Sequence, residues 1–131
     1  NRNAKAECVI IADSDVLVRY AISDYLRSCG YTVIETSTSD ETLTVLQEVK
    51  TVIDAMICDA EICGSINAFE LFRLARSLQP HLQIILAGSI ESSAKAAAQM
   101  CDHGPYLSRP YYPQGAVDYI KRLLARSQTK N

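Results

Sequence analysis

The chain has 131 residues, 48% of them hydrophobic, which is enough for one compact domain with its own core. Thirteen Lys and Arg residues against fifteen Asp and Glu residues give a formal net charge of −2, which disfavours binding to nucleic acid. The longest apolar runs are too short to span a bilayer, so no membrane partner is expected. We predict a single domain over residues 1–131, with an ordered core over about residues 7–126 and polar tails.

The cysteines are odd in number and lack the spacing of a metal-binding or redox motif. Most of them lie in apolar runs, where a thiol packs as a small hydrophobic group. This pattern predicts free thiols in a reducing, cytoplasmic compartment and disfavours a zinc site. The residues concerned are Cys8, Cys29, Cys58, Cys63 and Cys101.

The first half of the chain alternates between strand and helix patterns. Residues 8–12 (CVIIA) form an apolar run typical of a buried strand. Apolar residues at helical spacing follow, and Gly30 is a typical helix stop. A strand is predicted at 31–35, and a helix over about residues 39–49 with Ser39 or Asp40 as its cap.

The second half repeats this alternation. Residues 55–58 (AMIC) form a second buried strand, and Asn67 begins a helix that ends before Pro80. A strand at 82–87 precedes an alanine-rich helix at 91–101.

A fifth strand is predicted at 105–108, and Pro113 begins a fifth helix. Strands that alternate with helices require right-handed crossovers, and therefore a mostly parallel sheet covered on both faces. The fold class is thus α/β, a doubly wound domain, in which ligands bind beyond the carboxyl ends of the strands.

Charged side chains follow three of the predicted strands. Asp13 follows the first, Asp59 follows the third, and Arg109 follows the fifth. Two carboxylates at one sheet edge repel each other unless a hard cation such as Mg²⁺ neutralises them, with Asp59 as a candidate nucleophile and Arg109 as a stabilising cation. Alternatively, Asp13 or Asp15 caps the first helix, and Arg109 forms a plain ion pair with Asp59.

Three segments resemble the response-regulator receiver domains, of which the chemotaxis response regulator is the single-domain example. They are Val9–Arg19 (VIIADSDVLVR), Asp54–Asp59 (DAMICD) and Tyr106–Tyr112 (YLSRPYY). The resemblance covers nearly the whole chain. It implies a five-stranded flavodoxin-like sheet of order 2-1-3-4-5.

The resemblance also implies site roles. Asp59 would accept a phosphoryl group, with Mg²⁺ held by Asp13, Asp59 and the backbone carbonyl of Glu61, while Arg109 stabilises the phosphoryl oxygens. A conformational change would then be sensed on the face formed by the fourth helix, the fifth strand and the fifth helix. The implied partners are a sensor histidine kinase or phosphotransfer protein and a downstream protein or output domain. Apart from slow self-dephosphorylation, no enzyme activity is implied.

Several positions depart from the family pattern. Ser14 stands where a second metal-binding acid is expected, and Asp15 or water would have to compensate for it. Ala87 replaces a Thr or Ser that hydrogen-bonds the phosphoryl group and reports to the aromatic position, here Tyr106. Arg109 replaces a lysine, so it delivers its charge from a different position, and the Arg109–Pro110 bond is a candidate cis peptide. Cys63 lies in a loop that is one residue longer than usual.

These departures leave a second interpretation open. The chain would then be a pseudo-receiver, which keeps the fold and binds protein partners without phosphorylation. A small-molecule or flavin-binding domain is disfavoured, because the glycine-rich phosphate loop is missing. The exposed tyrosines would permit a homodimer through the last helices.

Overall fold

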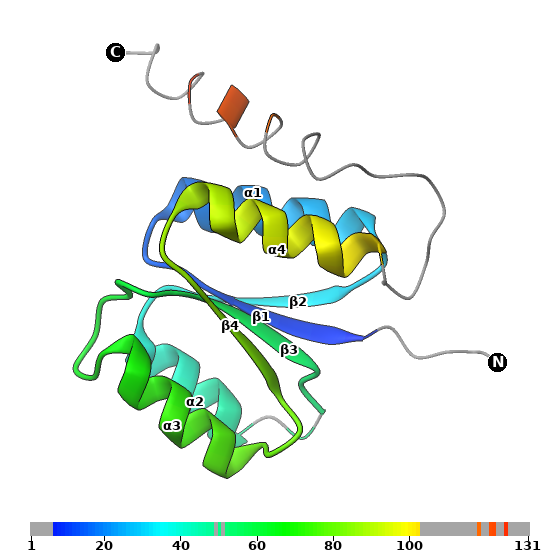
Figure 1. Ribbon diagram of the computed structural model, residues 1–131. Helices are drawn as coiled ribbons and strands as arrows, with labels where there is room; N and C mark the ends of the chain where they lie inside the picture. The colour runs from blue at the N-terminus through cyan, green and yellow to red at the C-terminus, as the bar shows by residue number, and fades with distance from the viewer. Residues whose placement is uncertain are drawn as a thin grey trace, which may run out of the picture.

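The computed structural model describes residues 7–48, 50, 52–102, 118, 121, 122 and 125. Strands and helices alternate through the described part (Figure 1). The strands are β1 (Cys8–Ala12), β2 (Thr32–Thr36), β3 (Ala55–Asp59) and β4 (Gln83–Ala87). The helices are α1 (Val16–Ser28), α2 (Ser39–Glu48), α3 (Ala68–Leu78) and α4 (Ile90–Asp102).

The strands form a parallel sheet in the order β2-β1-β3-β4. This order confirms the predicted doubly wound fold for the first four strands. The predicted fifth strand at 105–108 and the fifth helix from Pro113 lie outside the described residues. No helix in the described part of the chain is long and apolar enough to cross a membrane.

Helices cover both faces of the sheet (Figure 1). Alternate residues of β1 point to opposite faces, so that Val9 and Ile11 pack against α1 and α4, while Ile10 and Ala12 pack with α2 and α3. Because neither face meets water, β1 is buried along its whole length.

Side-chain hydrogen bonds at the starts of α1 and α2 fix the loops at the carboxyl edge of the sheet. Asp15 caps α1, as predicted, by accepting hydrogen bonds from the backbone N–H groups of Leu17 and Val18. The predicted cap of α2 is wrong, because the Thr38 hydroxyl accepts the capping bond from the Glu41 N–H at 3.0 Å. Ser39 and Asp40 instead bind the loop after β3: the Ser39 hydroxyl donates to the carbonyl of Ile66 at 2.7 Å, and the Asp40 carboxylate accepts from the Ser65 N–H at 2.9 Å.

Helix α4 lies beside α1, on the face of the sheet opposite α2 and α3 (Figure 1). A disulfide bond joins Cys29, at the end of α1, to Cys101 near the end of α4, with 5.5 Å between their Cα atoms. The prediction of free thiols is therefore wrong for this pair, although Cys8, Cys58 and Cys63 are free. No sequence pattern indicates this pairing, since it depends on how two helices that are distant in sequence pack together. The cysteines consequently no longer support the predicted reducing compartment.

Candidate functional site

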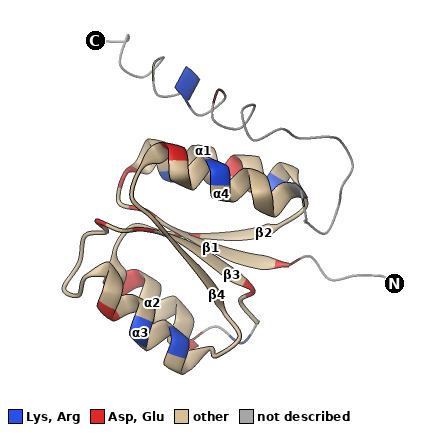
Figure 2. Cartoon of the chain, viewed as in Figure 1, with Lys and Arg blue, Asp and Glu red and all other residues tan. Residues whose placement is uncertain are grey.

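The ends of β1 and β3 bring two carboxylates to one cavity. The two strands are neighbours, with Ala12 opposite Cys58 in the register, so Asp13 and Asp59 come to the same edge of the sheet. Figure 2 shows acidic positions at this end of the sheet, as well as at its opposite end and on the helices. The cavity has a volume of about 160 Å³, and the first turn of α4 contributes one of its walls. It is lined by Asp13, Asp15, Val18, Asp59, Ala87, Ser89, Ile90 and Ser93.

Hydrogen bonds fix Asp13 on both its backbone and its side chain. Its N–H donates to the carbonyl of Thr36 at 3.0 Å, and its carboxylate accepts from the Asp15 N–H at 2.9 Å. The Arg19 guanidinium donates to the Asp13 carbonyl at 2.8 Å and pairs with Glu35 at 3.3 Å. Asp13 is therefore held in place before any ligand binds.

The environment of Asp13 disfavours its negative charge. The residue is only 8% exposed, and burial raises the pKa of its carboxyl to about 6, with the neighbouring charges of Asp59 and Asp15 adding to the rise. The Asp15 N–H and the Arg19 cation act in the opposite direction, without cancelling the effect of burial. Burial, followed by Asp59 and Asp13, likewise raises the pKa of the Cys58 thiol to about 12. The site thus carries negative charge that a cation would stabilise.

We predict that Asp13→Asn stabilises the fold at neutral pH. The native carboxyl holds its proton up to a pKa of about 6, whereas the unfolded one loses it near 3.8, so native stability falls as pH rises between these values. After a discount for solvent in the cavity, asparagine should raise the free energy of unfolding at neutral pH by about 1–2 kcal/mol. Denaturant unfolding in metal-free buffer at about pH 4 and about pH 7 measures this effect.

The matched control is Glu48→Gln, which removes an exposed carboxylate at the end of α2. The control should change stability by less than about 0.5 kcal/mol at both pH values. Equal stabilisation by Asp13→Asn at both pH values would contradict the explanation by charge burial.

Asp59 is half-buried at the end of β3. One of its carboxylate oxygens accepts a hydrogen bond from the Glu61 N–H at 3.0 Å, and its other oxygen accepts none from the residues that the structure describes. The Ala60 N–H donates to the Ala87 carbonyl at 2.9 Å, which ties this turn to the end of β4. The turn thus leaves one carboxylate oxygen of Asp59 available to a ligand.

Ser14 is directed away from the cavity. Its hydroxyl donates to the carbonyl of Ser37 at 2.8 Å and accepts from the Cys63 N–H at 2.9 Å. The side chain thereby joins the loops after β2 and β3, and it does not line the cavity. Asp15 does line the cavity, while it also caps α1.

The donor set suits only a sparsely ligated cation. No cluster of three or more His, Cys, Asp or Glu side chains in the described residues could hold a metal ion. Mg²⁺ usually keeps several waters and takes only one or two protein carboxylates, so Asp13 and Asp59 fit its needs. A structural zinc site, with four protein ligands, does not fit.

Of the remaining residues predicted for the site, two lie in the described part of the chain and two do not. Ala87 ends β4 opposite Asp59 in the register and is 2% exposed, and Glu61 is exposed on the turn after β3. Arg109, Tyr106 and the candidate cis bond at Arg109–Pro110 lie outside the described residues.

Sequence reasoning missed two contributors to the site. Arg19 holds Asp13, and Ser93 lines the cavity. The three serines within six residues of the end of β4 (Ser89, Ser92 and Ser93) were the available signal, because residues in the first turn of a helix that follows a strand lie at the carboxyl edge of the sheet.

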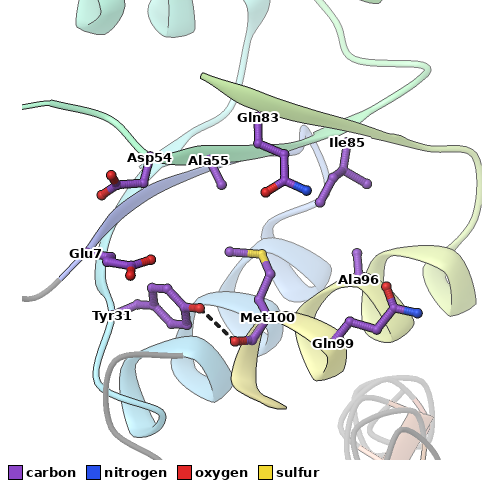
Figure 3. Close-up of a pocket in the computed structure, with 9 residues that line it drawn as sticks. All are labelled: Glu7, Tyr31, Asp54, Ala55, Gln83, Ile85, Ala96, Gln99 and Met100. Carbon is purple, nitrogen blue, oxygen red and sulfur yellow. Dashed lines mark hydrogen bonds between the residues drawn. The ribbon is translucent and has the colours of Figure 1, made fainter. Parts of the chain in front are cut away.

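A larger cavity, of about 510 Å³, lies at the opposite end of the sheet (Figure 3). Its lining includes Glu7, Asp54 and Gln83, which lie at the starts of β1, β3 and β4. The Tyr31 hydroxyl donates to the carbonyl of Met100 at 2.6 Å, and burial, with Glu7 and Asp54, raises the pKa of Tyr31 to about 12. Because this cavity lies at the opposite end of the sheet, its residues cannot contact a ligand bound to Asp59. The hydrogen bond from Tyr31 to the Met100 carbonyl helps to hold the end of α4.

The fold and the site define the class of molecule: an open parallel α/β domain with paired carboxylates at the carboxyl ends of β1 and β3. No family model matches the sequence, and no curated protein matches it. A structure assigned as a response regulator from Chloroflexus aurantiacus is 31% identical over 92% of this chain and 99% of that one, with a TM-score of 0.58. The chain belongs to the response regulator receiver (CheY-like) domains.

Two further solved structures share the fold at lower identity. A CheY-like receiver domain from Methanospirillum hungatei is 20% identical, covering 97% of this chain and 100% of that one, with a TM-score of 0.60. A response regulator from Burkholderia pseudomallei, solved with a phosphorylated aspartic acid and a calcium ion, is 17% identical over 95% of this chain and 75% of that one, with a TM-score of 0.57. Receiver domains are signalling domains rather than classical enzymes.

Proposed function

We propose that this receiver domain accepts a phosphoryl group on Asp59 with the help of Mg²⁺ and signals the event to a protein partner. The observation that carries the proposal is the cavity in which Asp59 and Asp13 meet, with one Asp59 oxygen accepting no hydrogen bond from the described residues. The related response regulator that carries a phosphorylated aspartic acid and a calcium ion supports the same chemistry.

The proposed reaction is a phosphoryl transfer. An oxygen of the Asp59 carboxylate bonds to phosphorus while the bond from phosphorus to the donor breaks, and the donor leaves with the electron pair. Asp13, Asp59 and the Glu61 carbonyl would hold Mg²⁺, which when bound neutralises charge on the phosphoryl oxygens. Arg109 is proposed to add a second positive charge.

The proposed donor is a sensor histidine kinase or phosphotransfer protein, and a small acyl phosphate could replace it in the laboratory. The proposed downstream partner is a protein or output domain that binds near α4. This helix contributes a wall of the Asp59 cavity, so a phosphoryl group would act on it directly. We propose Tyr106 as part of the same response.

One observation favours a pseudo-receiver as the second candidate. The Ser14 hydroxyl is held between the Ser37 carbonyl and the Cys63 N–H, and it does not line the cavity, so it supplies no ligand there. Ala87 in turn offers only a methyl group to the cavity. A domain that had lost phosphorylation could retain its fold with these substitutions and serve as a binding module.

Incubation with acetyl phosphate separates the two candidates. We expect intact-mass spectrometry to detect one phosphoryl adduct in the presence of Mg²⁺ and none after chelation by EDTA. Asp59→Asn should abolish the adduct, because an amide oxygen is a poor nucleophile and forms no acyl phosphate.

Glu48→Gln, which changes a carboxylate on α2 distant from the cavity, should label like the unmodified chain. A chain that stays unlabelled under conditions that label an ordinary receiver would overturn the proposal in favour of the pseudo-receiver. An adduct that persists in Asp59→Asn would place the acceptor elsewhere.

A further inference from the structure

The first turn of α4 brings the hydroxyl of a largely buried serine to the Asp59 cavity. Ser93 lines the cavity together with Asp13 and Asp59, and it is only 4% exposed. Its N–H donates to the Ser89 carbonyl at 3.1 Å, as in a regular helix. Its hydroxyl donates to no other residue that the structure describes, and its oxygen is not fully buried, so it is open to the cavity.

The hydroxyls of the neighbouring serines, Ser89 and Ser92, form hydrogen bonds with each other's residue. The Ser92 hydroxyl donates to the Ser89 carbonyl at 2.9 Å, and the Ser89 hydroxyl accepts from the Ser92 N–H at 3.1 Å. These bonds cap the start of α4. Ser89 and Ser93 are the hydroxyl residues of the cavity wall, and only the Ser93 hydroxyl is uncommitted within the described residues.

Because this hydroxyl makes no hydrogen bond to another described residue, it can donate to a ligand in the cavity without breaking an existing bond within the domain. The position also suits an anion, because Ser93 lies at the N-terminal end of a thirteen-residue helix, where the helix dipole is positive. Ala87, which lies opposite Asp59 in the sheet register, cannot donate a hydrogen bond there. The site thus lacks a hydroxyl on β4 and has one on α4.

The helix is held so that this hydroxyl stays over the cavity. The Cys29–Cys101 disulfide and the bond from Tyr31 to Met100 fix its far end against α1 and the start of β2. Its buried face consists largely of alanines, which lets it pack close to α1. Placement of Ser93 therefore follows from the packing of α4.

We propose that Ser93 is a phosphoryl-binding residue, whose hydroxyl donates a hydrogen bond to an oxygen of the phosphoryl group on Asp59. This inference rests on the proposed function and assigns to α4 a contact that the family pattern places at the end of β4. The contact would also couple phosphorylation to the position of α4, because it joins the first turn of the helix to β3.

The test compares Ser93→Ala with Ser93→Thr and with Ser92→Ala in the same turn. After labelling with acetyl phosphate and Mg²⁺, the rate of labelling and the lifetime of the adduct are followed by intact mass, and the ³¹P chemical shift of the adduct is recorded. Loss of a hydrogen bond to a charged group should reduce the labelling rate or the adduct lifetime about tenfold or more in Ser93→Ala. Ser93→Thr, which keeps a hydroxyl, should recover most of the loss. Ser92→Ala, which removes bonds at the helix start but keeps the Ser93 hydroxyl, should cause a much smaller loss than Ser93→Ala.

A shift of the ³¹P signal in Ser93→Ala but not in Ser92→Ala would show contact with the phosphoryl group, which a merely structural role would not produce. Normal labelling, lifetime and ³¹P shift in Ser93→Ala would overturn the inference while the proposed function stands. Equal losses in Ser92→Ala and Ser93→Ala would overturn it as well, since they would indicate general damage to the helix. An unmodified chain that cannot be labelled would overturn the proposed function itself.

Discussion

Removal of the Cys29–Cys101 disulfide is expected to lower the free energy of unfolding by about 4 kcal/mol. The bond spans 72 residues of sequence, and a crosslink that closes so long a loop removes much of the conformational freedom of the unfolded chain. Apart from this bond, the end of α4 is held by the hydrogen bond from Tyr31 to the Met100 carbonyl, while the helix buries mainly alanine side chains, which contribute little apolar area. The effect should therefore be concentrated in α4.

Denaturant unfolding of the oxidised chain, the reduced chain and the Cys29→Ala/Cys101→Ala variant measures the loss. Hydrogen exchange should become faster in α4 before it does so in β1 or β3, since weakly packed elements open first. Cys63→Ala, which removes an exposed free thiol, is the control and should change stability by less than about 0.5 kcal/mol. Equal stability of the oxidised and reduced chains would contradict the role given to the bond.

Gly64→Ala is expected to destabilise the domain by about 3 kcal/mol. Gly64 has a φ of +139°, a conformation that favours glycine, and an added Cβ would lie 2.0 Å from the Ser39 hydroxyl oxygen and 2.9 Å from the Ser39 backbone nitrogen. Ser39 cannot easily retreat, because its N–H donates to the Cys63 carbonyl at 2.8 Å and its hydroxyl donates to Ile66. The loop after β3 would have to move instead.

This displacement of the loop should reach the Asp59 site, because the loop begins directly after Asp59. The loop also contains the Cys63 N–H, which donates a hydrogen bond to the Ser14 hydroxyl. We therefore expect slower labelling of Gly64→Ala as well as a lower unfolding midpoint. Gly88→Ala is the matched control for stability, since a Cβ at Gly88 would meet nothing within 4 Å. A Gly64→Ala variant as stable as Gly88→Ala would show that the loop accommodates the methyl group.

Local patterns were sufficient to predict much of the described fold. The apolar run at 8–12 is strand β1, Asp15 and Asn67 cap α1 and α3, and the alternation of elements predicted a parallel sheet. The same logic placed Asp13 and Asp59 at one edge, because the carboxyl ends of parallel strands coincide. These features depend on residues close together in sequence or on the direction of the strands.

Features that depend on long-range packing could not be predicted in this way. The Cys29–Cys101 pair forms because α4 lies beside α1, and neither cysteine differs in sequence context from a buried thiol. The orientation of Ser14 follows from the distance between two loops rather than from its own neighbours in sequence. The contribution of Ser93 likewise depends on where α4 begins above the sheet.

The most direct test of the account locates the phosphoryl group on the chain. After labelling with acetyl phosphate and Mg²⁺, reduction with borohydride converts an aspartyl phosphate to homoserine, and peptide mass mapping then identifies the modified residue. The account predicts homoserine at position 59 alone, and only in the labelled sample. Homoserine at another carboxylate, or at none under conditions that label an ordinary receiver, would contradict the assignment of Asp59 as the acceptor.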